Sequence, residues 1–163
     1  SDLNDYVDIA DSTLINSGGP WPKRTLSLWF KAEDVTSRKF LFSTGGTTNG
    51  LTVYVSGGKV YTGGWTSEGW SGGTFINSTT TIEENKWYHV AVRLDADTSA
   101  TTLQADAFKL YINGVEEASG TGKRLTASHK SYIGGGGTTM RTHSGNLAQS
   151  SASFQGLIGD VQL

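Results

Sequence analysis

The sequence predicts an all-β fold, a sandwich of two antiparallel sheets with jelly-roll topology. The first observation is that apolar and polar residues alternate with a period of two in many short stretches, as strands with one buried face do. The second is that turn signals separate these stretches, which gives roughly ten to thirteen short strands. The third is that no long segment keeps the 3.6-residue period of a helix, in a chain with 22 Gly among 163 residues.

Each predicted strand is a stretch of this kind with a turn signal near its end. In chain order the stretches are residues 25–31, 39–43, 51–56, 59–65, 87–94, 108–114, 130–137 and 154–163. The first of them, TLSLWFK, places Leu26, Leu28 and Phe30 on one face. SGGK at 56–59 predicts a hairpin turn, and Asn113-Gly114 predicts a second one, because Asn and Gly accept the positive φ of tight turns.

Length, charge and composition limit the classes of function. A chain of 163 residues suits one domain spanning residues 1–163. The formal net charge of -2 gives no basic field for nucleic acid or an anionic membrane, and no apolar run is long enough to span a bilayer. The chain has no Cys, which excludes disulfides. Its abrupt start at SDLNDYVDI and its strand-like end GLIGDVQL lead us to expect a module taken from a longer polypeptide.

Four landmarks in order carry a family resemblance. They are NDYVDIADSTLI (4–15), TLSLWFKA (25–32), KWYHVAVRLD with KLYINGVEEASG (86–95 and 109–120), and IGGGG with FQGLIGDVQL (133–137 and 154–163). Together they resemble the concanavalin A-like, laminin G-type jelly roll found in modules of bacterial secreted and adhesive proteins. The resemblance implies a calcium-binding domain outside the cell, attached to other domains of the same polypeptide, that binds glycans or proteins.

Some proteins of this architecture are enzymes, but the acidic residues of this sequence do not follow the catalytic pattern of those enzymes. Glycanases of this architecture carry a Glu-x-Asp-x-x-Glu-like motif on one strand, and this sequence has none. Glu83-Glu84 and Glu116-Glu117 are adjacent pairs, so on a strand the two carboxylates of each pair point to opposite faces. We therefore expect a domain that is not itself an enzyme.

Two tryptophans in the stretch YTGGWTSEGWSGG (61–73) are the main candidates for ligand binding. Trp65 and Trp70 stand among glycines that have no side chains to cover them, and exposed rings are good platforms for the C–H faces of sugars. The alternative is that both rings fold back as a hydrophobic lid. Tyr61 opens the same stretch and is a further ligand candidate. Arg141, His143 and Asn146, in a polar segment near the C-terminus, line the same site if both segments lie at one end of the sandwich.

The other aromatic residues are interpreted as structural. Trp29 alternates out of phase with the apolar face of its strand, and we expect it to pack under a loop or a neighbouring strand. Trp87 opens a strand and is also expected to be a packing residue. Trp21, between Pro20 and Pro22, is expected to plug one end of the sandwich. His89 shares the outward face of its strand with Arg93, which predicts a surface position.

Calcium binding is predicted from two groups of oxygen ligands, because Ca²⁺ takes six to eight oxygens. Near the termini the candidates are Asn4, Asp5, Asp8 and Asp160, which the resemblance brings together at the sandwich edge. The second group is Asp95, Asp97 and Asp106 in DADTSATTLQAD. The alternative for each Asp is ordinary turn chemistry, in which the carboxylate accepts hydrogen bonds from its own backbone.

Three hypotheses of function remain. The first is a non-catalytic, lectin-like module that binds a polysaccharide or other glycan and has a structural calcium. The second is an adhesive or spacer domain that binds protein or displays neighbouring modules. The third is a polysaccharide hydrolase or lyase.

Overall fold

The computed structural model describes residues 5–67, 70–98, 102–126, 130–135, 140–144, 147–148 and 153–163. In these ranges the chain forms thirteen strands and no helix, which confirms the all-β class. The strands are β1 (Val7–Ile9), β2 (Lys23–Ala32), β3 (Lys39–Gly45), β4 (Gly50–Ser56), β5 (Lys59–Thr66), β6 (Trp70–Asn77), β7 (Trp87–Asp95), β8 (Gln104–Ile112), β9 (Val115–Gly122), β10 (Ser131–Ile133), β11 (Met140–Arg141), β12 (Leu147–Ala148) and β13 (Gly156–Gln162). Among the described residues there is thus no helix that could cross a membrane.

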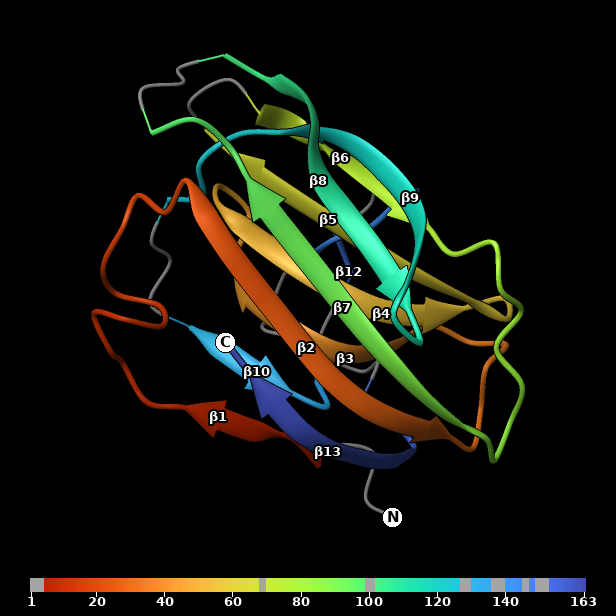
Figure 1. Ribbon diagram of the computed structural model, residues 1–163. Helices are drawn as coiled ribbons and strands as arrows, with labels where there is room; N and C mark the ends of the chain where they lie inside the picture. The colour runs from red at the N-terminus through yellow and green to blue at the C-terminus, as the bar shows by residue number, and fades with distance from the viewer. Residues whose placement is uncertain are drawn as a thin grey trace.

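Two antiparallel sheets stack on each other, as predicted (Figure 1). In the described residues one sheet has six strands in the order β1-β10-β3-β4-β5-β6, and the other has five in the order β13-β2-β7-β8-β9. A short hairpin, β11–β12, belongs to neither sheet. At one edge of the sandwich β6 contacts β9, and at the other edge β1 and β13 line a shared groove. The first and last strands therefore lie near each other.

Strand β2 shows how the predicted alternation builds the interior. Leu26, Leu28 and Phe30 are at most 4% exposed and belong to the main core between the sheets. They lie opposite the inward-facing residues of β7, where the pairing sets Leu28 against Val90 and Phe30 against Tyr88. Burying each large apolar side chain contributes roughly 1.5–3 kcal/mol to folding, so this alternation fixes the register of the sheet.

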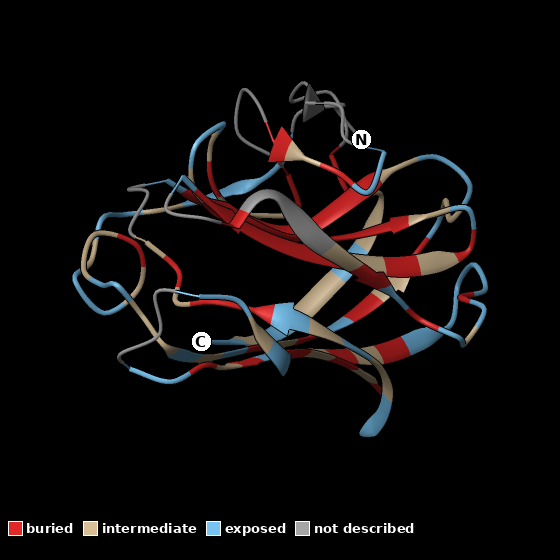
Figure 2. Cartoon of the chain, turned by 90° about the horizontal axis from the view of Figure 1, so that it is seen from above, coloured by how far each residue is buried: buried red, intermediate tan, exposed pale blue. Residues whose placement is uncertain are grey.

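The central strands of the six-stranded sheet are buried on both faces. Side chains on the inner face join the main core, while Phe40, Tyr54, Trp65 and Met140 form a second cluster on the outer face. Figure 2 shows the consequence: one layer is red along most of its length, and the other alternates in colour. The outer face of the six-stranded sheet is thus buried over its central strands β3, β4 and β5.

Both predicted hairpin turns are confirmed. Gly57 and Gly58 have φ values of 56° and 70°, and Asn113 and Gly114 have φ values of 50° and 80°. Positive φ at both central residues defines a type I′ turn, whose twist matches that of the flanking strands. These turns connect β4 to β5 and β8 to β9.

The glycine-rich stretch 61–73 is largely strand and not an open loop. It contributes to β5 and β6, which pair in antiparallel fashion. A Cβ atom on Gly63 would lie 2.4 Å from the ring of Phe75, and one on Gly64 would lie 2.6 Å from the ring of Trp70. The glycines are therefore sites where aromatic rings lie directly on the backbone.

Trp65 and Trp70 are both buried, so the hypothesis that they form a sugar-stacking platform is wrong. Trp70 is 1% exposed and meets Phe108 edge to face, with ring centroids 5.8 Å apart in the main core. Trp65 is 0% exposed and lies on the opposite face of the sheet, in the second cluster, where Nε1 donates to the carbonyl of Gly46 at 2.8 Å. The glycines next to Trp65 and Trp70 in the sequence have no side chains to cover the two rings. Residues of other strands cover them instead.

Two tryptophans expected to be packed are exposed instead. Trp29 is 42% and Trp87 is 48% exposed, on the outer face of the five-stranded sheet. Their predicted packing role is wrong, because no described loop or strand covers this part of the face. Trp21 does pack at the rim of the core, with the Arg24 guanidinium 4.3 Å from its ring centroid, which confirms the predicted plug. His89 lies on the outward face of β7, also as predicted.

Candidate functional site

Three of the predicted ligand residues come together on the outer face of the six-stranded sheet. Tyr61 projects from β5, while Arg141 and His143 belong to the segment that begins with β11. Trp65 lies on the same face but beneath the surface, and Trp70 lies on the opposite face. Asn146 lies outside the described residues. The structure thus brings the two segments together on one face, and the ligand-binding role of Tyr61, Arg141 and His143 stays a prediction.

Backbone contacts hold the Arg141 segment on the sheet. The hydroxyl of Thr52 donates to the carbonyl of Arg141 at 3.4 Å, and Nε of Arg141 donates to the carbonyl of Thr47 at 3.2 Å. Met140, at 0% exposure, anchors the segment in the second cluster. The buried methionine therefore fixes the position of the polar residues that follow it.

The rings of Tyr54, Tyr61 and His143 form a stack. The centroids of Tyr61 and His143 are 4.0 Å apart with an interplanar angle of 15°, and those of Tyr54 and Tyr61 are 5.5 Å apart at 11°. Tyr54 is buried, Tyr61 is half-buried and His143 is exposed. The stack thus runs from the covered part of the sheet to the surface and ends at an imidazole.

Hydrogen bonds define the state of the His143 imidazole. The backbone N–H of His143 donates to the hydroxyl of Tyr54 at 2.8 Å, and Nδ1 lies 2.8 Å from the same hydroxyl. Burial raises the pKa of Tyr54, so the phenol keeps its proton, and the direction of its hydrogen bond to Nδ1 follows the tautomer of the imidazole. Partial desolvation, and then the charge of Arg38, lower the pKa of His143. Both effects favour the neutral form of the imidazole, which carries one ring N–H donor.

This arrangement offers a surface for a polar ring-shaped ligand. The exposed imidazole presents an aromatic surface and an N–H donor, and the half-buried Arg141 adds a cation on the same segment. None of these groups is placed as a nucleophile or as a pair of acids. Among the described residues no three His, Asp or Glu side chains gather closely enough to hold a metal ion.

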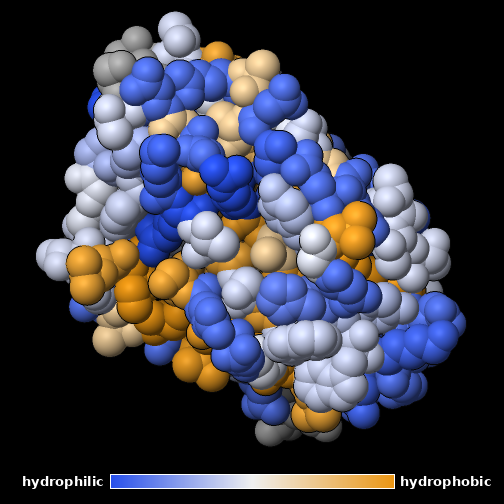
Figure 3. Space-filling model, viewed as in Figure 1, coloured by the Kyte–Doolittle hydropathy of each residue, from blue (hydrophilic) through white to orange (hydrophobic). Residues whose placement is uncertain are grey.

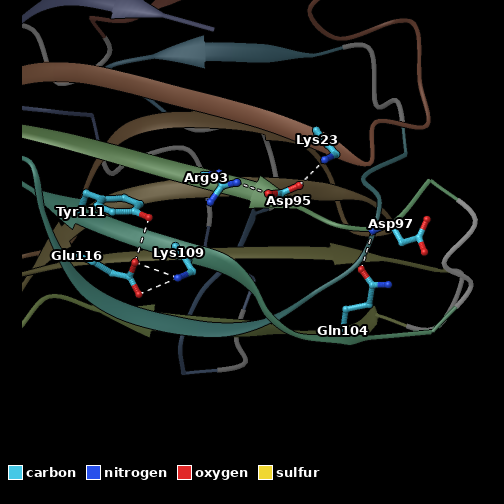
Figure 4. Close-up of polar contacts among 8 residues, drawn as sticks. All are labelled: Lys23, Arg93, Asp95, Asp97, Gln104, Lys109, Tyr111 and Glu116. Atoms are coloured by element: carbon cyan, nitrogen blue, oxygen red, sulfur yellow. Dashed lines mark hydrogen bonds and ion pairs between the residues drawn. The ribbon is translucent and has the colours of Figure 1, made fainter.

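The acidic cluster after β7 does not fit calcium. Asp95 accepts from Lys23 at 2.9 Å and also pairs with Arg93, so two cations neutralise it (Figure 4). The hydrogen bond from Lys23, and then the charge of Arg93, hold the pKa of Asp95 below its usual value. The backbone N–H of Asp97 donates to Oε1 of Gln104 at 2.6 Å, and Oδ1 of Asp97 accepts from the Thr98 hydroxyl at 3.5 Å. Asp106 accepts from the hydroxyl of Ser119 at 2.7 Å.

The terminal carboxylates do not form a complete calcium site in the described residues either. Asp5 and Asp8 are exposed, and Oδ1 of Asp160 accepts from Nε2 of Gln162 at 3.0 Å. Asn4 lies outside the described residues. Calcium binding at the termini therefore stays a prediction.

Calcium has a direct test. If the terminal carboxylates bind it, millimolar calcium added after EDTA treatment raises the melting temperature, because a ligand of the folded state alone stabilises that state. We expect Asp160→Asn to reduce this rise and Asp95→Asn to leave it unchanged, as measured by differential scanning calorimetry. An identical melting temperature in calcium and in EDTA would remove calcium from the description of this domain.

The chain belongs to the concanavalin A-like lectin/glucanases superfamily, whose family model matches residues 1–163. No curated protein matches the sequence. Among solved structures it is similar to domains LG4-5 of the mouse laminin alpha1 chain, with a TM-score of 0.69 and 14% identity over 98% of this chain and 39% of that one. This chain thus spans well under half of that laminin structure.

Two further structures share the fold. One is domain 4 of AbnA, a GH43 extracellular arabinanase from Geobacillus stearothermophilus, in complex with arabinotriose, with a TM-score of 0.59 and 22% identity over 96% of this chain and 64% of that one. The other is the CBM40 of a Ruminococcus gnavus IT-sialidase, bound to alpha2,3 sialyllactose, with a TM-score of 0.57 and 19% identity over 83% and 72% of the two chains. At these identities the likeness shows the fold alone.

Proposed function

We propose that this chain is a non-catalytic carbohydrate-binding module that acts outside the cell, and that a glycan binds on the outer face of the six-stranded sheet. The observation that carries the proposal is the exposed His143 imidazole, stacked on Tyr61 and hydrogen-bonded to Tyr54. A neutral, oriented N–H donor beside a cation suits the hydroxyls of a sugar ring. Superfamily membership supports the proposal, as do two neighbours whose structures hold arabinotriose and sialyllactose.

Binding to a panel of soluble polysaccharides tests the proposal, and arabinan is the first probe. We expect His143→Ala to weaken binding at least tenfold, which corresponds to about 1.4 kcal/mol. Tyr61→Ala should act in the same direction, because it removes the support of the imidazole. Thr102→Ala is the matched control, since Thr102 is exposed and distant in the chain from this site.

The result depends on the variants being folded, so each is first checked by thermal melting. Full affinity in folded His143→Ala and Tyr61→Ala would contradict the proposed site. If the wild-type domain binds none of the glycans, the adhesive or spacer hypothesis replaces the glycan-binding one. Release of reducing ends or unsaturated products would instead establish the hydrolase or lyase hypothesis.

A further inference from the structure

The outer face of the five-stranded sheet carries a second group of exposed aromatic residues. We define the Trp29 patch as Trp29 and Lys31 of β2 with Trp87 and His89 of β7, bordered by β13. Trp29 pairs with His89 and Lys31 pairs with Trp87 in the register of the sheet. The two tryptophans are therefore diagonal neighbours, which places them about 7–8 Å apart in an antiparallel sheet. Figure 3 looks onto this outer face, where polar blue and pale side chains cover much of the surface.

One side of the Trp29 ring is open. On the β7 side, the His89 ring lies 5.2 Å from Trp29 between centroids, at an interplanar angle of 54°. On the β13 side the register partner is Gly159, and a Cβ atom placed there would meet nothing within 4 Å. Gly159 has no side chain to cover the indole, which leaves room for a ligand beside the ring.

Several charges on this face lie in ion pairs, and Lys31 inside the patch does not. Asp95 pairs with both Lys23 and Arg93, and Glu116 accepts from Lys109 at 2.9 Å and from Tyr111 at 3.1 Å (Figure 4). Lys31 has no carboxylate within ion-pair distance in the described part of the chain. Its cross-strand neighbours are Trp87 and Leu157, which carry no charge.

A lysine charge without an ion-pair partner, on the same face as Trp29 and opposite Trp87 in the register, is complementary to an anionic group on a ligand with apolar faces. An acidic sugar combines these properties, because the C–H face of a pyranose stacks on an aromatic ring and its carboxylate pairs with an ammonium group. The exposed face of a sheet suits an extended chain of such sugars. A neutral sugar would use the rings and leave Lys31 unpaired.

We propose that the Trp29 patch is a second carbohydrate site, on the sheet opposite to the His143 site, and that it binds uronic acid residues of an acidic polysaccharide. Trp29 provides the stacking platform, Trp87 extends it, and Lys31 binds the carboxylate. This site is independent of the one on the six-stranded sheet. A glycan bound at each face would let one module bridge two polysaccharide chains.

The experiment compares oligogalacturonate with its methyl ester, in which the ring is kept and the charge is removed. Calorimetric titration of the wild-type chain should give at least fivefold tighter binding of the acid. Trp29→Ala should weaken binding of both ligands at least tenfold, and Trp29→Phe should restore part of it. Lys31→Met should weaken binding of the acid two- to fivefold and leave the ester unchanged, because an exposed ion pair contributes little.

Two further variants separate the two sites. Thr25→Ala, exposed on the same face of β2, is expected to bind as the wild type does. His143→Ala is expected to lose the glycan of the six-stranded sheet and to keep oligogalacturonate. The proposal is overturned if the wild type binds neither ligand, if acid and ester bind equally, or if folded Trp29→Ala keeps its affinity. Loss of oligogalacturonate in His143→Ala would assign the acidic sugar to the first site and overturn the second.

Discussion

Trp70→Ala is expected to lower the free energy of unfolding by about 3–5 kcal/mol, as large-to-small substitutions of buried aromatic residues do. The indole is 1% exposed, contacts Phe108 and lies on the backbone of Gly64. Its removal leaves a cavity between the sheets that rigid strands cannot fill. Since domains of this kind are stable by only about 5–15 kcal/mol, urea denaturation should show a large shift in midpoint.

A double-mutant cycle with Gly64→Ala isolates the contact itself. In the wild-type background the new methyl group lies 2.6 Å from the Trp70 ring, so we expect a destabilisation of about 1–3 kcal/mol from overpacking. In the Trp70→Ala background the ring is gone, and the same substitution should destabilise the fold much less. Additive effects would mean that the ring does not lie on Gly64.

Trp65→Ala is the second substitution with a large expected effect, again about 3–5 kcal/mol. Trp65 lies in the second cluster beside Phe40 and Met140, and it donates a hydrogen bond to Gly46. Trp65→Phe keeps a ring and loses the donor, so it should destabilise the fold less than the alanine variant does. The pair of variants is measured by urea denaturation.

The same variants distinguish a structural Trp65 from a ligand-binding one. If Trp65 is structural, its removal affects glycan binding only indirectly, through a displacement of Met140 and of His143 that follows it. At temperatures where the variant is folded, we therefore expect binding to weaken but not to be lost. An unchanged stability together with complete loss of binding would contradict the buried position and restore the stacking-platform hypothesis.

Local alternation was enough to predict β2, β7 and the second half of β8 in the five-stranded sheet. In β2 and β7 every second residue enters the core, so period and phase follow from the sequence. The hairpin turns at Gly57-Gly58 and Asn113-Gly114 were equally plain, because few residue types accept their backbone angles. These features depend on near neighbours in the chain.

The six-stranded sheet was harder to interpret because distant segments cover it. Residues 140–144 bury the outer face of β4 and β5, and nothing local to those strands indicates this. The glycines beside Trp65 and Trp70 therefore suggested that both rings are exposed. In the paired strands, aromatic rings occupy the space that side chains at the glycine positions would fill. At Trp29 the error was reversed: the phase of the strand correctly placed the ring outward, but the assumed cover was absent among the described residues.

Tyr61, Arg141 and His143 were identified as ligand candidates without knowledge of their geometry. The hydrogen bond between Tyr54 and the imidazole was not predictable, since it joins positions 89 residues apart. The Trp29 patch had a signal in the sequence, namely a large aromatic residue out of phase with its strand and a glycine in the last strand. Only the register of β13 against β2 sets the two side by side.

That register has a consequence for folding. Trp29 and Gly159 come from distant parts of the sequence, and among the described residues β13 pairs with β2 alone. Closing so long a loop is entropically costly and slow, so pairings of this kind form late. A chain cut shortly before Gly156 therefore retains all four residues of the patch without the strand that borders them.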